Sequence, residues 1–143
     1  MTEQTLSKIG DQTYTTVLGD VGWSISGRYY WNVKINKFQN EDDIFLGVAY
    51  KKIDCTSCPI HSKYWGIMPI YSKKFSPSEV GNLIDYGNPA QVGDNIGILV
   101  EFRNKKANIT FFKNDVSLGL AYEGIPGMLF PVVTLLGSSN SIV

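Results

Sequence analysis

The residues best suited to metal binding or nucleophilic chemistry lie in one short stretch of the chain. Cys55 and Cys58 form a Cys-x-x-Cys pair, and His61 follows closely, which offers three ligands of the kind that zinc prefers. A closed structural zinc site needs a fourth ligand, and the sequence has no second Cys/His pair. We therefore expect an exposed loop with two ordinary thiols, with a metal site or an oxidisable cysteine pair as the alternatives.

Catalysis at this stretch is not supported by the order of its residues. Pro59 follows the second cysteine instead of lying between the two, which fits a thioredoxin-like site poorly. His61 is the only histidine and could serve Cys58 or Ser62, but neighbours in sequence rarely form a triad and no acid partner is indicated. We expect no enzymatic activity and no cofactor.

The other charged clusters are typical of solvated turns. Glu41, Asp42 and Asp43 lack the alternating oxygen ligands of a calcium loop. The lysine doublets are scattered along the chain, although the first two flank the loops expected to bind a partner and could favour an acidic one. They are found at 51–52, 73–74 and 105–106.

The overall composition bounds the class of protein. The chain has 143 residues, 43% hydrophobic and 13% aromatic, with a formal net charge of zero. One domain with a real core is expected, and an even charge balance argues against nucleic-acid binding or an electrostatic membrane anchor. No membrane-length apolar run and no secretory h-region is present. With only two cysteines, we expect a reducing compartment, the cytoplasm or alternatively the nucleus.

The strongest pattern lies in 93–135. Apolar residues there alternate with small or polar ones in three segments joined by short polar turns, which predicts an antiparallel meander. The three segments are 96–102, 109–111 and 116–120.

Further strands are expected on both sides of the meander. Gly47 and Ala49 are small, as if another element lies close to their side of the strand. Pro69 suggests a short or edge strand, and Pro131 suggests a bulge in a central strand that is covered on both faces. The expected strands are 14–18, 28–35, 44–50, 65–70 and 128–136.

The remaining segments are predicted to be loops. Residues 51–63 and 71–92 have no periodicity, apart from a possible short helical turn at 76–80, and 123–127 should be a turn. No stretch is typical of a long amphipathic helix. Many short strands with frequent Gly/Pro turns predict an all-β sandwich or barrel.

Six motifs follow one another along the chain: GRYYWNV at 27–33, IFLGVA at 44–49, WG at 65–66, YG with GDNIG at 86–97, FFKND with LGLAY at 111–122, and FPVVTL at 130–135. In order and spacing they resemble the motifs of SPRY domains, and the resemblance covers about 10–143. Two departures stand out. Asp115 replaces a turn glycine, which aspartate can do because it tolerates positive φ, and we expect the last strand to be cut short at Val143.

This resemblance implies a sandwich of two bent antiparallel sheets with little or no helix, no catalysis, and rim loops that bind a protein or peptide. We expect one domain over 1–143, with 1–12 a lightly held lead-in, acting as a monomer. It would not bind nucleic acid or insert into a membrane.

Loop aromatics are the expected contacts with a partner, because Tyr and Trp are favoured as binding anchors. The rim would combine the 19–27 turn, both long loops and the turn after Leu136. An alternative is a lectin-like sandwich with Trp23 and Asp20 at a sugar, and another is a purely architectural domain. The expected partner-binding residues are Trp23, Tyr50, Tyr64, Tyr71, Tyr86, Leu136 and Gly137.

Overall fold

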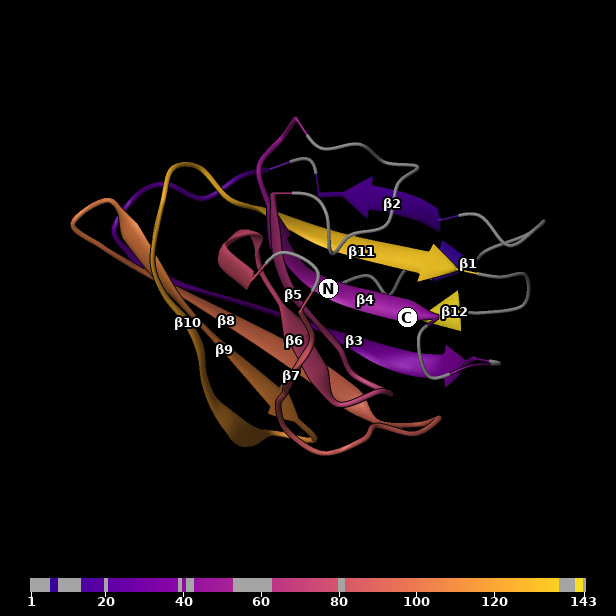
Figure 1. The fold of residues 1–143 in the computed structure, drawn as a ribbon. Helices are drawn as coiled ribbons and strands as arrows, with labels where there is room; N and C mark the ends of the chain where they lie inside the picture. Colours follow the sequence, from indigo (N-terminus) through magenta and orange to yellow (C-terminus); the bar gives the residue numbers. More distant parts are fainter. Residues whose placement is uncertain are drawn as a thin grey trace.

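The structure is a computed structural model, and it describes residues 6–7, 14–19, 21–38, 40, 43–52, 63–79, 82–136 and 141–142. Two six-stranded antiparallel sheets form the two layers in Figure 1. The first has the order β1 (Leu6–Ser7), β12 (Ser141–Ile142), β3 (Gly27–Lys37), β8 (Asn95–Arg103), β9 (Lys106–Lys113) and β10 (Val116–Pro126). The second has the order β2 (Tyr14–Leu18), β11 (Phe130–Leu136), β4 (Ile44–Ala49), β5 (Tyr64–Met68), β6 (Lys73–Phe75) and β7 (Ile84–Asp85).

This arrangement confirms the predicted all-β sandwich. Helical structure among the described residues is limited to one 3-10 turn, η2 (Pro77–Glu79), which falls where a short helical turn was expected. In the described part of the chain, no helix has the length and apolar character needed to cross a membrane.

The predicted meander is present as β8, β9 and β10. Two-residue turns connect its strands, with positive φ at Asn104 (53°) and Lys105 (63°) and again at Asn114 (51°) and Asp115 (68°). Two consecutive positive φ values match the twist of a tight hairpin. Aspartate at 115 therefore keeps the turn, as expected for a residue that tolerates this conformation.

The main core lies between the two sheets. Side chains of β8 that point inward, Ile96, Ile98 and Val100, belong to the same buried cluster as Leu46 and Val48 of β4. Each such aliphatic side chain contributes about 1.5–3 kcal/mol when it is fully removed from water. The period-two pattern in the sequence therefore identified the inward face correctly.

Strand β4 is buried on both faces. Phe45 and Ala49 point away from the main core into a second cluster that also contains Met68 of β5. Gly47 permits the close approach of β5, because a Cβ at this position would lie 2.1 Å from the carbonyl oxygen of Trp65. The expected neighbour beside the small residues is therefore the adjacent strand of the same sheet.

The two predictions about proline had different outcomes. Strand β5 is short, as one of the two alternatives for Pro69 required: it has five residues and ends at Met68, and it lies between β4 and β6 and not at an edge. The bulge predicted at Pro131 was wrong. Pro131 pairs with Val48 in a register that continues from Phe130 to Leu135, so β11 has no bulge there.

Two irregular segments also contain more strand than predicted. Strand β10 extends into the segment 123–127, which was predicted to be a turn, and ends at Pro126. Its pairing with β9 shifts register near Gly119 and Gly124, where φ is 96° and 70°. These irregularities break the simple alternation that sequence reasoning needs. The long segment 71–92 contains β6 and β7, which are too short to show a period.

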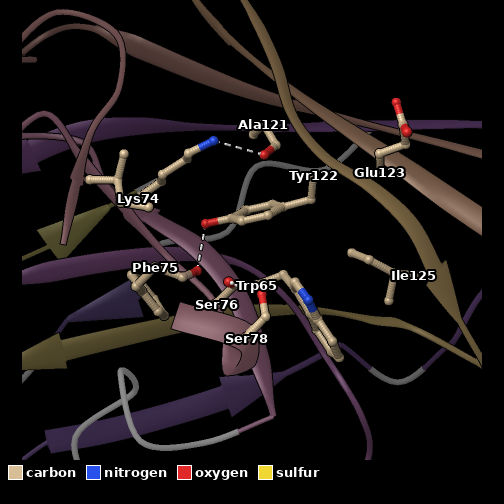
Figure 2. Close-up of a pocket in the computed structure, with 10 residues that line it drawn as sticks. Trp65, Lys74, Phe75, Ser76, Ser78, Ala121, Tyr122, Glu123 and Ile125 are labelled. Atoms are coloured by element: carbon tan, nitrogen blue, oxygen red, sulfur yellow. Dashed lines mark hydrogen bonds between the residues drawn. The ribbon is translucent and has the colours of Figure 1, made fainter. Parts of the chain in front are cut away.

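The edge strand β10 is fastened to the second sheet by a tyrosine hydroxyl. The Tyr122 oxygen lies 2.7 Å from the carbonyl oxygen of Gly66 and 2.5 Å from that of Phe75, so its single proton serves both. Figure 2 shows the ring reaching across the gap between the layers. Burial raises the pKa of the Tyr122 phenol well above its usual range, so the hydroxyl stays a donor even in mild alkali.

Two further side chains cover carbonyls along the same edge. Lys74 Nζ donates to the carbonyl oxygen of Ala121 at 3.0 Å, as Figure 2 shows. It also lies 5.7 Å and 5.5 Å from the ring centroids of Tyr86 and Tyr122. The Tyr86 hydroxyl donates to the carbonyl oxygen of Gly119. An uncovered edge strand would present such carbonyls to another chain, so these contacts protect β10.

We expect Tyr122→Phe to lower the free energy of unfolding by about 1–3 kcal/mol, because it leaves two carbonyls without their shared donor. Urea unfolding at neutral pH measures this. Tyr30→Phe is the control, since Tyr30 is 49% exposed, and a surface change of this size should stay within about 0.5 kcal/mol. Equal effects of the two substitutions would contradict the role of Tyr122.

The hydrogen bonding of Tyr122 also predicts how the stability of the protein changes at high pH. The folded-state pKa of Tyr122 is raised, so its contribution is complete below the ordinary tyrosine pKa of about 10 and is lost as the pH rises above it. The stability difference between the native protein and Tyr122→Phe should therefore shrink above about pH 10. A constant difference across this range would count against the assignment.

Asp94 holds the start of β8 through two hydrogen bonds. Its carboxylate accepts the side-chain amide of Asn114 at 3.0 Å and the backbone N–H of Gln91 at 2.8 Å. The Asn114 amide, and then the Gln91 N–H, hold the pKa of Asp94 below its usual value. Both donors favour the charged form.

Asp94→Asn should therefore reduce stability at pH 7, and the deficit should narrow as the pH falls below about 4, where the native carboxylate becomes protonated. The midpoints of urea unfolding at pH 7 and pH 3 measure the stability deficit of Asp94→Asn at the two pH values. Asp115→Asn, which removes the same charge at the neighbouring exposed turn, serves as the control. The interpretation fails if the Asp94→Asn deficit is as large at pH 3 as at pH 7.

Candidate functional site

A backbone bridge closes the loop 21–26 onto the segment before β11. The N–H of Trp23 donates to the carbonyl oxygen of Leu129 at 2.7 Å, and the N–H of Leu129 donates back to Trp23 at 3.0 Å. Gly22 makes the approach possible, because a Cβ there would lie 2.8 Å from Met128 Cγ. The loop and the bridged segment therefore form one surface, at the end of the sandwich that carries the β8–β9 turn (Figure 1).

This surface exposes large apolar side chains. Val21 is 69% exposed, Ile25 is 73% exposed and Met128 is 49% exposed, while Trp23 and Tyr50 are half-buried beside them. We call these five residues the apolar rim. A group of exposed apolar side chains on a well-formed surface is typical of an interaction site, whereas single exposed ones are ordinary.

Aromatic contacts hold the loop half of the rim in place. The Trp23 ring stacks on Tyr29 with centroids 5.4 Å apart and planes 17° apart. The Tyr29 hydroxyl donates to the carbonyl oxygen of Ile25 at 2.9 Å. The loop therefore has its backbone fixed at Trp23 and Ile25, which limits the entropy lost when a partner binds.

Tyr50 supports the other half of the rim. Its hydroxyl donates to the carbonyl oxygen of Pro126 at 2.6 Å, and its ring meets Trp65 edge-on at 5.1 Å. Gly127 turns the chain over this ring with φ of 92°, and a Cβ there would lie 3.2 Å from Tyr50. Tyr50 thus ties the end of β4 to the end of β10.

The side chains of the apolar rim are suited to apolar contact with another molecule. Its exposed members are apolar, and the hydroxyls of Tyr29 and Tyr50 already donate to backbone carbonyls. Such a surface can bury apolar side chains of another molecule. Within the described ranges, no group of three or more His, Cys, Asp or Glu could hold a metal ion. Cys55, Cys58 and His61 lie outside the described residues.

The structure does not bring all of the predicted contact residues together. Trp23 and Tyr50 share the apolar rim, but Leu136 ends β11 at the opposite end of the sandwich, where its N–H donates to the carbonyl oxygen of Asp43 at 2.7 Å. Gly137 lies outside the described residues. Leu136 itself therefore lies apart from the apolar rim, because β11 separates the two ends.

Tyr64 was predicted to contact a partner, but the structure places it in the interior. Its side chain is only 1% exposed and its ring lies 5.1 Å from that of Phe75. Thr134 donates to its hydroxyl at 3.4 Å, and burial raises the pKa of the phenol above its usual range. Tyr64 begins β5 and points into the second buried cluster, so it cannot contact a partner at the surface.

Tyr71 and Tyr86 lie elsewhere, beside β6 and β7. Tyr71 is half-buried and Lys73 Nζ lies 5.4 Å from its ring centroid. Tyr86 is also half-buried and takes part in the contacts that cover β10, and its hydroxyl accepts the N–H of Phe111 at 3.3 Å. Burial raises the pKa of Tyr86. Its hydrogen bonds give Tyr86 a structural role.

A cleft of about 250 Å³ opens between β6 and β10 beside Tyr122 (Figure 2). Its hydroxyl groups are partly committed to each other, since the Ser76 and Ser78 oxygens lie 3.1 Å apart. Its cation, Lys74, already donates to Ala121. The cleft is therefore mainly the space left beside the contacts by which Tyr122 and Lys74 hold β10 against the second sheet.

Sequence reasoning missed the most exposed members of the rim, Val21, Ile25 and Met128. Val21, Trp23 and Ile25 occur at every second position of a Gly-bounded loop, and that spacing could have drawn attention to them. Nothing in the sequence links them to Met128, because the contact depends on a bridge between segments far apart in the chain.

The comparisons with known proteins agree with this fold. Similar solved structures include the SPRY domain of human HERC1 (22% identical, covering 97% of this chain and 86% of that one, TM-score 0.77) and another human SPRY domain (19% identical, 99% and 91% covered, TM-score 0.76). A Ran-binding proteins 9/10 homolog from Drosophila melanogaster is 32% identical over 113 residues, which are 78% of this chain but only 11% of that protein. The family model for the SPRY domain matches residues 28–143. The chain therefore belongs to the SPRY domain family, whose members are known as protein-interaction modules.

Proposed function

We propose that this domain is a non-catalytic module that binds a short segment or surface of a partner protein through the apolar rim. The observation that carries the proposal is the exposure of Val21, Ile25 and Met128 on a loop closed by reciprocal backbone hydrogen bonds. A rigid apolar surface gains binding free energy from burial without first having to order itself. The family's general role in protein interaction supports the same choice.

The rest of the molecule is compatible with binding at this end. The β10 edge is covered by Tyr122, Tyr86 and Lys74, which disfavours strand addition there. The lectin alternative loses support, because the ring of Trp23 already stacks on Tyr29 and is only half-exposed. We propose further that the domain acts as a monomer, in the cytoplasm or the nucleus, as a recognition part of a larger protein.

We expect Ile25→Ser combined with Met128→Ser to abolish or strongly weaken partner binding. Short peptides selected on the native domain from a phage-displayed random library provide the ligand, and their affinity is measured by fluorescence anisotropy. Each well-placed apolar contact contributes about 1–2 kcal/mol, so the double variant should bind at least tenfold more weakly.

The matched control is Val92→Ser combined with Val116→Ser. These side chains are 58% and 67% exposed and lie near the opposite end of the sandwich. Their replacement should leave affinity unchanged. Selected peptides that bind both double variants equally well would show that the rim is not the binding surface.

A further inference from the structure

Backbone contacts connect Tyr50 to lysines from three separate parts of the chain. Lys51 follows it directly, and the N–H of Tyr50 donates to the carbonyl oxygen of Lys63 at 3.3 Å. The Tyr50 hydroxyl donates to Pro126, which pairs with Lys106 across β10 and β9. All three lysines are exposed. We call Lys51, Lys63 and Lys106 the basic flank of the apolar rim.

The basic flank has no acidic partner within the described residues. The ion pairs found there are Arg28 with Glu101, and Lys73 with Asp85. The turn between β8 and β9 adds more exposed cations at this end, namely Arg103 and Lys105. This end of the sandwich is therefore locally positive although the chain's formal charge is zero.

The opposite end is closer to neutral among the described residues. Asp43, Asp94 and Asp115 lie there together with Lys34, Lys37 and Lys113. The excess of cations at the rim end arises because successive strands run in opposite directions, which places 50–52, 63 and 103–106 there, against Glu101 and Glu123. A local field of this kind selects and steers a partner even when the net charge is zero.

We infer that the surface takes an acidic, amphipathic protein segment whose apolar side chains cover the rim while its carboxylates meet the basic flank. The inference rests on the proposed function and adds the chemistry of the partner. Apolar and cationic groups meet at Tyr50, so a segment carrying aliphatic or aromatic residues next to Asp or Glu satisfies both.

A protein segment fits better than a membrane or a nucleic acid. Extended anionic surfaces and polymers contact a wide face of a protein, whereas the exposed apolar and cationic groups here are gathered around one end of the sandwich. Stacking of bases needs free aromatic faces, whereas Trp23 stacks on Tyr29 and Tyr50 packs against Trp65. A short segment responds to the local field instead.

The test uses the same phage-displayed random peptides. Peptides selected on the native domain should be enriched in Asp and Glu beside aliphatic or aromatic residues. Lys51→Glu combined with Lys106→Glu should weaken their binding about tenfold, since two exposed charge contacts become repulsive. Rising NaCl should weaken the native domain's binding and reduce this difference.

The matched control is Lys34→Glu combined with Lys37→Glu, which changes the charge equally through exposed lysines toward the other end of β3. It should leave affinity unchanged. Circular dichroism establishes that both variants are folded. If either failed to fold, Lys51→Gln with Lys106→Gln and Lys34→Gln with Lys37→Gln would replace them, with a smaller but selective loss expected for the first pair.

Other outcomes separate the two proposals. Peptides that depend on Ile25 and Met128 but lack acidic residues, or that bind Lys51→Glu/Lys106→Glu normally, would overturn the inference and leave the proposed function standing. Peptides indifferent to both sets of variants would overturn both. A membrane role for the basic flank would also overturn the inference. In that case the native domain would sediment with phosphatidylcholine/phosphatidylserine vesicles, Lys51→Glu/Lys106→Glu would not, and the selected peptides would show no enrichment in acidic residues.

Discussion

Burial of apolar side chains between two antiparallel sheets is the constraint on which the rest of the molecule depends. Ile98 and Ile109 of the first sheet and Ile44 and Leu46 of the second are completely buried in one cluster. Because inward and outward positions alternate along a strand, satisfying this core assigns nearly every other strand residue to a face. The loops at the two ends of the sandwich are largely freed from that requirement, and they are where binding groups can gather.

The sides of the sandwich are closed by polar contacts. Tyr122 and Lys74 donate to backbone carbonyls across the gap between the layers, and Tyr86 donates to β10. These donors lie in a partly buried setting, where an unpaired carbonyl would be costly. Closing the edge both stabilises the sandwich and removes a place where another strand could pair, which is consistent with the proposed binding at one end.

Strand direction explains why residues that look unrelated in sequence act together. Lysine doublets at 51–52 and 105–106 follow or join strands that finish at the same end. The doublet at 73–74 instead lies in β6, where Lys73 pairs with Asp85 and Lys74 fastens β10. Similar sequence features therefore have two different roles, and a total charge of zero describes neither.

The sequence by itself determined the fold class, the β8–β10 meander and the turn at Asn114 and Asp115, because strand periodicity and turn chemistry are local properties. It also led to the prediction that Trp23 and Tyr50 contact a partner, which stays a proposal. Only the tertiary structure decided that Tyr64 is buried, that Leu136 lies at the far end, and that Met128 joins Val21 and Ile25. The physical reason is that a period of two identifies the two faces of a strand but specifies neither its neighbours nor what covers its second face.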